Sequence, residues 1–85
     1  MPSKTVTVGS AVGLHARPAA TIAEAAAGTG VPVTLAVAGG EPVDAGSALL
    51  IMTLGAHKGA EVTVSSDDAD AVETVAALVE ADLDA

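Results

Sequence analysis

Apolar and polar residues alternate with a period of two in three segments of the chain, residues 4–8, 31–37 and 60–65. A period of two places every second side chain on the same face of a strand, so each segment predicts a β-strand with one buried face. Pro32 indicates a strand start or an edge strand, because proline donates no ladder hydrogen bond. The residues predicted to face inward are Val6, Val8, Val31, Val33, Leu35, Val37, Val62 and Val64. The opposite, wetted face would carry Thr5, Thr7, Thr34 and Thr63.

Two other segments have the three- and four-residue spacing of amphipathic helices. The first helix is predicted over residues 16–27, with Pro18 in its first turn, where a missing N–H costs no helix bond. The second is predicted over residues 70–83, with Asp67 or Asp68 as its N-cap. The apolar stripes are Ala19, Ile22, Ala23 and Ala26 in the first helix and Val72, Val75, Ala76, Val79 and Leu83 in the second.

The middle of the chain is less clearly patterned. Residues 39–40 are two glycines, a hairpin turn signal, and residues 41–43 would form a short return strand. The apolar run 48–54 fits a strand by periodicity. However, Ser47 before it is a good N-cap and Gly55 after it is a stop signal, so a short helix is favoured.

The predicted element order is β-α-β-β-α-β-α. Strands and helices that are each apolar on one side only predict an α+β fold, with helices packed on one face of an antiparallel sheet. We therefore expect an open-faced sandwich with a four-stranded antiparallel sheet and three helices on one face. A chain of 85 residues has room for one core, so residues 1–85 are expected to form a single domain.

The chain has eleven acidic and three basic residues, which give a formal net charge of -8. Such a chain cannot neutralise the phosphates of a nucleic acid, so nucleic-acid binding is excluded. The composition is also typical of proteins that stay soluble in concentrated salt, where charge repulsion is screened. A halophilic source is one hypothesis, and an ordinary acidic protein is the other. With no cysteine, no targeting segment and no apolar run of about 20 residues, we expect a cytoplasmic protein that does not bind membranes.

The candidate chemistry lies in Gly13-Leu14-His15-Ala16-Arg17-Pro18-Ala19, where the first strand region leads into the first helix. A helix N-terminus presents unpaired N–H groups and a partial positive charge, which together attract an anion. An ordinary imidazole titrates at about pH 6.5, so His15 can act as a nucleophile at neutral pH. A phosphoryl group on His15 would be held by the amides of Ala16 and Arg17 and by the Arg17 guanidinium, with no cofactor. The alternative is a merely solvent-exposed histidine.

These seven residues resemble the active-site signature of HPr, the histidine phosphocarrier of the phosphoenolpyruvate-dependent sugar phosphotransferase system. The element order is similar to the HPr fold, and Ser47 with Met52-Thr53-Leu54-Gly55 is placed like the family's second, serine-centred motif. The resemblance implies that His15 takes a phosphoryl group from enzyme I, through Nδ1, and passes it to an enzyme IIA in sugar uptake. It implies that Arg17 stabilises this group and that the protein is a substrate of other enzymes, not an enzyme.

Ser47 and the helix after it have two interpretations each. Ser47 is explained by N-capping alone, whereas in many Gram-positive members of the family a kinase phosphorylates the matching serine. Gly46 stands where those members often have a basic residue, which weakens the regulatory interpretation. Ala48, Leu49 and Met52 would form an exposed docking patch near His15. Alternatively, Leu49 and Met52 are core residues, although Leu50, Ile51 and Leu54 are available to fill the interior.

Three further expectations follow. His57 and Lys58 are read as solvated loop residues, and no ligand spacing supports a metal site built from His15 and His57. The first helix carries Glu24 where related proteins often have basic residues that meet acidic partners, so docking would depend on Arg17 and apolar contact.

Two rival functions remain open. One is delivery of phosphate to a dihydroxyacetone kinase or a nitrogen-regulatory branch, and the other is a regulatory binding module acting through the Ser47 surface. A catalytic activity of its own is the least favoured function for this protein.

Overall fold

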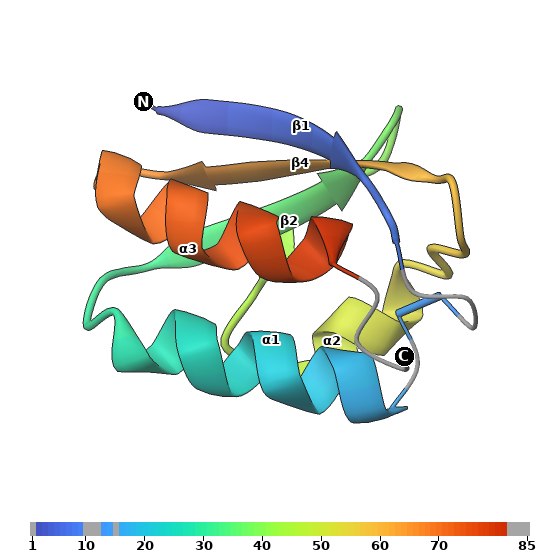
Figure 1. Ribbon diagram of the computed structural model, residues 1–85, viewed down its shortest axis with the longest axis horizontal. Coiled ribbons are helices and arrows are strands. Elements are labelled where there is room, and N and C mark those ends of the chain that lie inside the picture. Colours follow the sequence, from blue (N-terminus) through green and yellow to red (C-terminus); the bar gives the residue numbers. More distant parts are fainter. Residues whose placement is uncertain (1, 10–12, 15, 82–85) are drawn as a thin grey trace.

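The computed structural model of the protein describes residues 2–9, 13–14 and 16–81. Within these ranges the elements follow one another in the predicted order β-α-β-β-α-β-α (Figure 1). The strands are β1 (Ser3–Thr7), β2 (Val33–Val37), β3 (Val43–Asp44) and β4 (Glu61–Ser66). The helices are α1 (Ala16–Gly28), α2 (Ala48–Thr53) and α3 (Ala69–Glu80).

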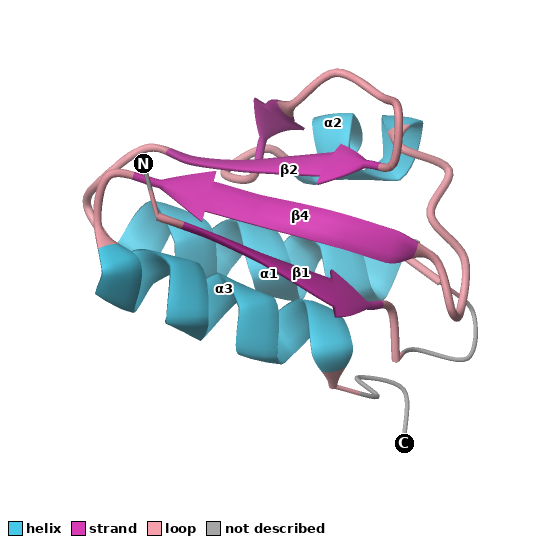
Figure 2. Cartoon of the chain, turned by 90° about the horizontal axis from the view of Figure 1, so that it is seen from above, coloured by secondary structure: helices cyan, strands magenta, loops and turns pink. Residues whose placement is uncertain are grey.

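The four strands form one sheet in the order β1-β4-β2-β3, and every neighbouring pair is antiparallel. The register sets Val6 opposite Val62 and Leu35 opposite Val64, and all four side chains are buried. Figure 2 looks onto the opposite face, which none of the described helices covers. On that face the hydroxyls of the Thr5–Thr63 pair lie 2.9 Å apart. The four-stranded open sandwich predicted from the pattern is therefore confirmed.

Helices α1 and α3 lie side by side beneath the sheet and pack against each other (Figure 1). The predicted stripes are confirmed, because their described members are buried: Ala19, Ile22, Ala23 and Ala26 in α1 and Val72, Val75, Ala76 and Val79 in α3. The chain contains no aromatic residue. The core is accordingly built from small and aliphatic side chains, of which Ile22, Leu35 and Ile51 are the largest that are fully buried.

Strands β1 and β4 are each shifted by one residue from the predicted 4–8 and 60–65, and the other two strands differ more. Strand β2 begins at Val33, two residues later than expected, and β3 covers Val43–Asp44 where residues 41–43 were expected. Pro32 and Pro42 lie just outside these two strands. Because proline donates no backbone hydrogen bond, neither residue can take part fully in the ladder. The glycine turn between the strands is confirmed, since the Gly40 amide donates a 2.9 Å bond to the Val37 carbonyl oxygen.

The apolar run after Ser47 forms helix α2, as predicted. Ser47 is its N-cap, and the Ser47 Oγ accepts a 3.3 Å hydrogen bond from the Leu50 amide. The expectation that Leu50 fills the interior is wrong, because its side chain is 39% exposed. A helix of six residues at the edge of the molecule directs few side chains inward, and Ile51 is its fully buried one.

The last helix is shorter than predicted. Asp68 is its N-cap, and the Asp68 Oδ1 accepts a 2.9 Å bond from the Asp70 amide. The helix ends at Glu80 instead of Leu83, because Ala81 is already extended, with φ -71° and ψ 151°. Its last turn holds no basic residue to interact with the negative end of the helix dipole. Leu83 lies outside the described residues.

Candidate functional site

His15, the candidate phosphoryl acceptor, lies outside the described residues, so the site is built here from its neighbours. Gly13 and Leu14 precede it, and α1 begins at Ala16, the next residue in the chain. Ala16 and Arg17 are exposed, whereas Pro18 is buried against the core. The sequence prediction that the histidine motif leads directly into a helix is therefore confirmed for the residues around position 15.

The first turn of α1 offers positive charge without a competing carboxylate. It contains no acidic residue, and its first backbone N–H groups have no partner within the helix. In the described part of the chain the ion pair between Lys4 and Glu73 is the only one, so the Arg17 guanidinium is not paired there. An anion at this helix end would meet both the amides and the guanidinium.

The segment before position 15 is held by a loop far away in sequence. The Leu14 amide donates a 2.9 Å hydrogen bond to the carbonyl oxygen of Ala56, and the Leu14 side chain is buried. Gly13 has a φ of +76°, and a Cβ atom there would lie 2.5 Å from the Ala56 oxygen and 2.8 Å from the Cα of His57. Only glycine tolerates both this φ and this close approach. Sequence reasoning missed this contact, because it joins residues 13–14 to residues 56–57, which lie more than 40 positions away in the chain.

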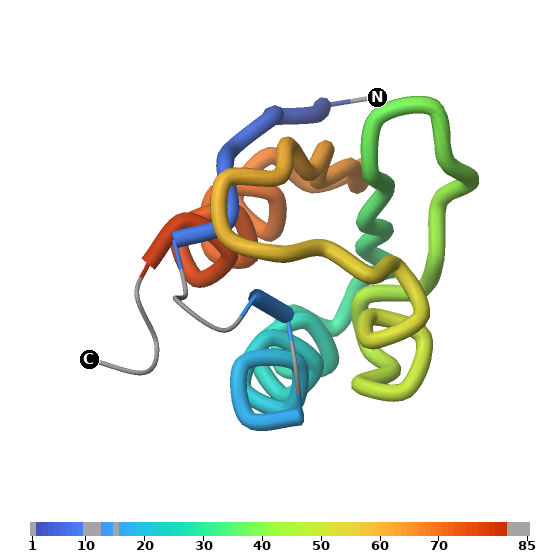
Figure 3. Tube along the Cα trace, turned by 90° about the vertical axis from the view of Figure 1, so that its right-hand side faces the viewer, coloured from blue at the N-terminus to red at the C-terminus, as the bar shows by residue number. Residues whose placement is uncertain are grey.

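Helix α2 packs against α1 and lies beside its N-terminal half (Figures 1 and 3). Its exposed large apolar side chains are Leu49 at 70%, Leu50 at 39% and Met52 at 38% exposure, and Ala48 is half-buried. Leu49 and Met52 are therefore not core residues. The exposed patch also includes Leu50, which the sequence prediction had assigned to the interior.

His57 and Lys58 are both exposed, as predicted for loop residues. The described residues contain no group of three or more His, Cys, Asp or Glu side chains that could hold a metal ion. None of the described helices is both long enough and apolar enough to cross a membrane.

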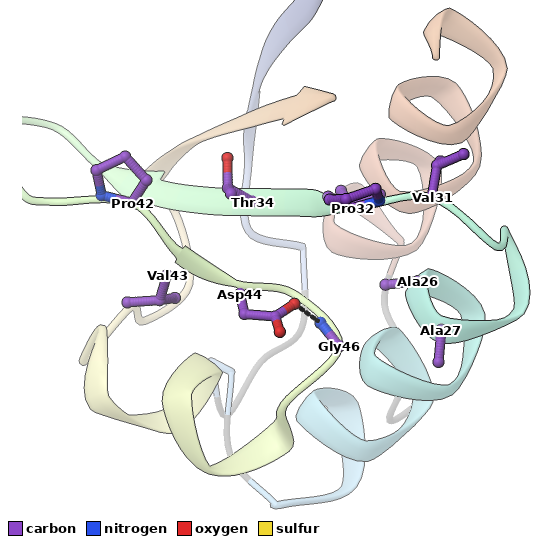
Figure 4. Close-up of a pocket in the computed structure, with 10 residues that line it drawn as sticks. Ala26, Ala27, Val31, Pro32, Thr34, Pro42, Val43, Asp44 and Gly46 are labelled. Carbon is purple, nitrogen blue, oxygen red and sulfur yellow. Dashed lines mark hydrogen bonds between the residues drawn. The ribbon is translucent and has the colours of Figure 1, made fainter. Parts of the chain in front are cut away.

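A separate cavity of about 550 Å³ lies at the other end of α1. It is lined by Ala26 and Ala27 of that helix and by residues of β2 and β3, among them Thr34 and Asp44 (Figure 4). Ten residues separate Ala16 from Ala26, which is about 15 Å along a helix. No motif of the sequence falls in this cavity, and the Asp44 carboxylate there already accepts a 2.8 Å bond from the Gly46 amide. The cavity is therefore not the site of the histidine chemistry.

A family model described as "PTS HPr component phosphorylation site" matches residues 2–81 of the chain. The curated phosphocarrier protein HPr of Streptomyces coelicolor is 52% identical over 67 residues, which cover 79% of this chain and 72% of that protein. The family-model match includes the sequence on both sides of the histidine motif.

Solved structures agree with these sequence matches. The phosphocarrier protein HPr of Bacillus anthracis has a TM-score of 0.83 and 32% identity, over 92% of this chain and 95% of that one. HPr-C-His of Thermoanaerobacter tengcongensis has a TM-score of 0.84 and 30% identity, over 94% of this chain and 92% of that one. The histidine-containing phosphocarrier protein of a mycoplasma, at 24% identity and a TM-score of 0.74 over 92% of this chain and 86% of that one, shows the shared fold alone.

Proposed function

The chain belongs to the HPr family of phosphocarrier proteins of the phosphotransferase system, and on this premise we propose that His15 is the residue that carries the phosphoryl group. The observation that supports this assignment best is the start of α1 at Ala16, immediately after the histidine of a motif that the family model covers. The amides of this helix end and the exposed Arg17 can bind the oxygens of a phosphoryl group there.

The transfer is a displacement at phosphorus. A ring nitrogen of His15, Nδ1 by resemblance to the family, uses its lone pair to form the N–P bond while the bond from phosphorus to the donor breaks. The amides of α1 and the Arg17 guanidinium stabilise the negative charge on the phosphoryl oxygens. In the second transfer the acceptor's nucleophile bonds to phosphorus, and the N–P electron pair returns to the imidazole. The protein thus begins and ends each cycle unchanged, as a substrate of its partners.

The donor in this proposal is enzyme I charged by phosphoenolpyruvate, and the acceptor is a sugar-specific enzyme IIA in the cytoplasm. Leu49 and Met52 belong to an exposed apolar patch on α2 that can contact either partner. Glu24 is exposed on α1, and this helix has Arg17 as its one basic residue. Docking therefore depends on apolar contact more than on charge.

The test is phosphorylation of the purified chain by enzyme I and phosphoenolpyruvate from the same source. We expect one phosphoryl group per chain, labile in acid and stable in base, on a peptide that contains His15. The His15→Ala variant should acquire none, while Lys4→Gln, a surface change on β1, should be labelled like the wild type. Labelling of His15→Ala to the wild-type level would overturn the assignment.

The acceptor branch needs a second measurement. A dihydroxyacetone kinase subunit or a nitrogen-regulatory chain would use the same donor chemistry, so transfer of the label from the phosphorylated protein to each purified candidate acceptor separates the branches. A regulatory role of Ser47 is the other candidate, favoured by its position as N-cap beside the exposed patch of α2. It predicts labelling of Ser47 by ATP and a serine kinase, and function that survives His15→Ala but not Ser47→Asp.

A further inference from the structure

The few basic and imidazole side chains of this acidic protein are unevenly placed. Lys4 lies on β1, where its Nζ pairs with the Oε2 of Glu73 at 3.1 Å. The remaining four such residues, His15, Arg17, His57 and Lys58, fall in two short segments. Neither residues 13–18 nor residues 55–60 contain any Asp or Glu. Both segments belong to longer stretches without an acidic residue, residues 1–23 and 45–60, in a chain with a formal net charge of -8.

These two segments are joined in the fold. The Leu14 amide is bonded to the Ala56 carbonyl oxygen at 2.9 Å, and the Cα of His57 lies against Gly13. In Figure 3 the segment that leads into β4 passes close to residues 13–14. The backbone that carries His57 and Lys58 thus lies against the segment that leads directly into His15.

The loop is also fixed in its own conformation. Residues 57–60 form a tight turn, closed by a 2.9 Å bond from the Ala60 amide to the His57 carbonyl oxygen. Val8 accepts a 2.9 Å bond from the Gly59 amide and donates another of 2.9 Å to Ala60. These bonds hold the turn against Val8, and Ala56, just before the turn, holds Leu14, so the loop of residues 56–60 is bonded to the chain on both sides of residues 9–13. Movement of the turn relative to the histidine motif would break bonds at both ends.

The basic and imidazole side chains of this region are available for an external anion. Arg17, His57 and Lys58 are all exposed, and within the described ranges none of them pairs with a carboxylate. Two glutamates lie on neighbouring segments: Glu61 begins β4 directly after this loop, and the backbone carbonyl of Glu80 lies against Gly9. Both are exposed residues. Their negative charge opposes an incoming anion, and the cations offset it.

We propose that residues 56–60 form a second wall of the phosphoryl site, in which His57 and Lys58 act with Arg17 to stabilise the phosphorylated state of His15. This inference rests on the proposed function, because it needs a phosphoryl group on His15. Lys58 acts as a positive charge, and the imidazole of His57 has an N–H donor in either protonation state. The N–P bond forms and breaks as described above, and neither residue exchanges a proton in the step. Such a local positive region lets a highly acidic protein accept a dianionic group.

The test compares charge removal at two places. Lys58→Gln removes a charge and His57→Ala removes an N–H donor from the proposed wall, singly and in the double variant, whereas Lys4→Gln removes the same charge as Lys58→Gln from β1, whose paired partner lies on α3. The measurement is the equilibrium between the phosphorylated and free protein at fixed ratios of phosphoenolpyruvate to pyruvate, with enzyme I as the catalyst. If the Lys58 charge and the phosphoryl group are on the order of 10 Å apart in water, their attraction favours the phosphorylated protein. We therefore expect Lys58→Gln to lower the equilibrium constant for phosphorylation about threefold. The difference should vanish at about 1 M salt, where the Debye length is about 3 Å.

Lys58→Arg keeps the charge and should restore the wild-type equilibrium constant. Melting curves of every variant show whether the fold is intact, and a purely structural role of the loop would not produce the salt dependence. The proposal is overturned if Lys58→Gln and His57→Ala shift the equilibrium no more than Lys4→Gln does, and the assignment of His15 would still stand. If the wild-type protein takes up no phosphoryl group, the proposed function fails and this inference fails with it.

Discussion

The amide of Leu14 and the carbonyl oxygen of Ala56 are joined by a 2.9 Å hydrogen bond across 42 positions of sequence. This bond connects the segment before His15 with the loop before β4. Gly13 permits the approach, since its φ is +76° and a side chain there would meet the backbone of residues 56–57. The segment before His15 is therefore held by residues that are distant in sequence.

Gly13→Ala should destabilise the fold by more than about 2 kcal/mol, because it adds both a left-handed alanine and a backbone clash. Gly30→Ala is the matched control, with the same φ of +76° but no atom within 4 Å of the new Cβ. It should cost only about 1 kcal/mol. Urea unfolding at neutral pH measures both free energies. Equal losses in the two variants would show that the contact with Ala56 imposes no constraint.

Ser47→Ala should lower the stability by about 1 kcal/mol, because the Leu50 amide loses its capping partner. Ser47→Asp should retain most of the stability, since aspartate caps a helix as well as serine does. Thermal unfolding followed by far-ultraviolet circular dichroism measures both changes. If Ser47→Asp proves as unstable as Ser47→Ala, capping is not the structural role of this side chain.

Leu49 and Ile51 are two residues apart on α2 but differ fully in burial, at 70% and 0% exposure. Ile51→Ala should cost about 2–4 kcal/mol through the cavity it leaves. Leu49→Ala should change the stability by less than about 0.5 kcal/mol. It should instead raise the concentration of this protein needed for half-maximal transfer from enzyme I. A Leu49→Ala protein that unfolds easily, or that docks unchanged, would contradict the assignment of the α2 patch.

The acidic surface predicts that stability depends on salt. Eleven acidic and three basic residues leave a formal net charge of -8, and the described residues contain one ion pair. Raising the salt to about 1 M screens the repulsion between exposed carboxylates and should raise the melting temperature. Asp67→Asn removes one charge from the cluster before α3 and should stabilise the protein in low salt only. A melting temperature that is the same with and without salt would contradict adaptation to salt.

The elements and their core faces could be read from the pattern of the chain, because burial of one face imposes a period of two on strands and of 3.6 on helices. Predicted inward residues such as Val6, Ile22 and Val75 are fully or almost fully buried. The predictions that were wrong concern the ends of strands and helices and the edge of the molecule. At these positions a single feature decides where a strand or helix begins or ends. Examples are Pro42 beside β3 and the absence of basic residues in the last turn of α3. Leu50 was misassigned because a helix of two turns at the molecular edge has too narrow a buried face.

The sequence by itself determined the order of the elements, the buried stripes and the position of His15 just before a helix, since these depend on neighbours in the chain. The tertiary structure alone decided that residues 56–60 lie against Gly13 and Leu14, and that Leu49, Leu50 and Met52 face outward. Contacts between distant segments arise from how the sheet and helices pack, and local periodicity holds no information about them. The basic side chains of His57 and Lys58 therefore acquired a place beside the histidine motif only when the chain was folded.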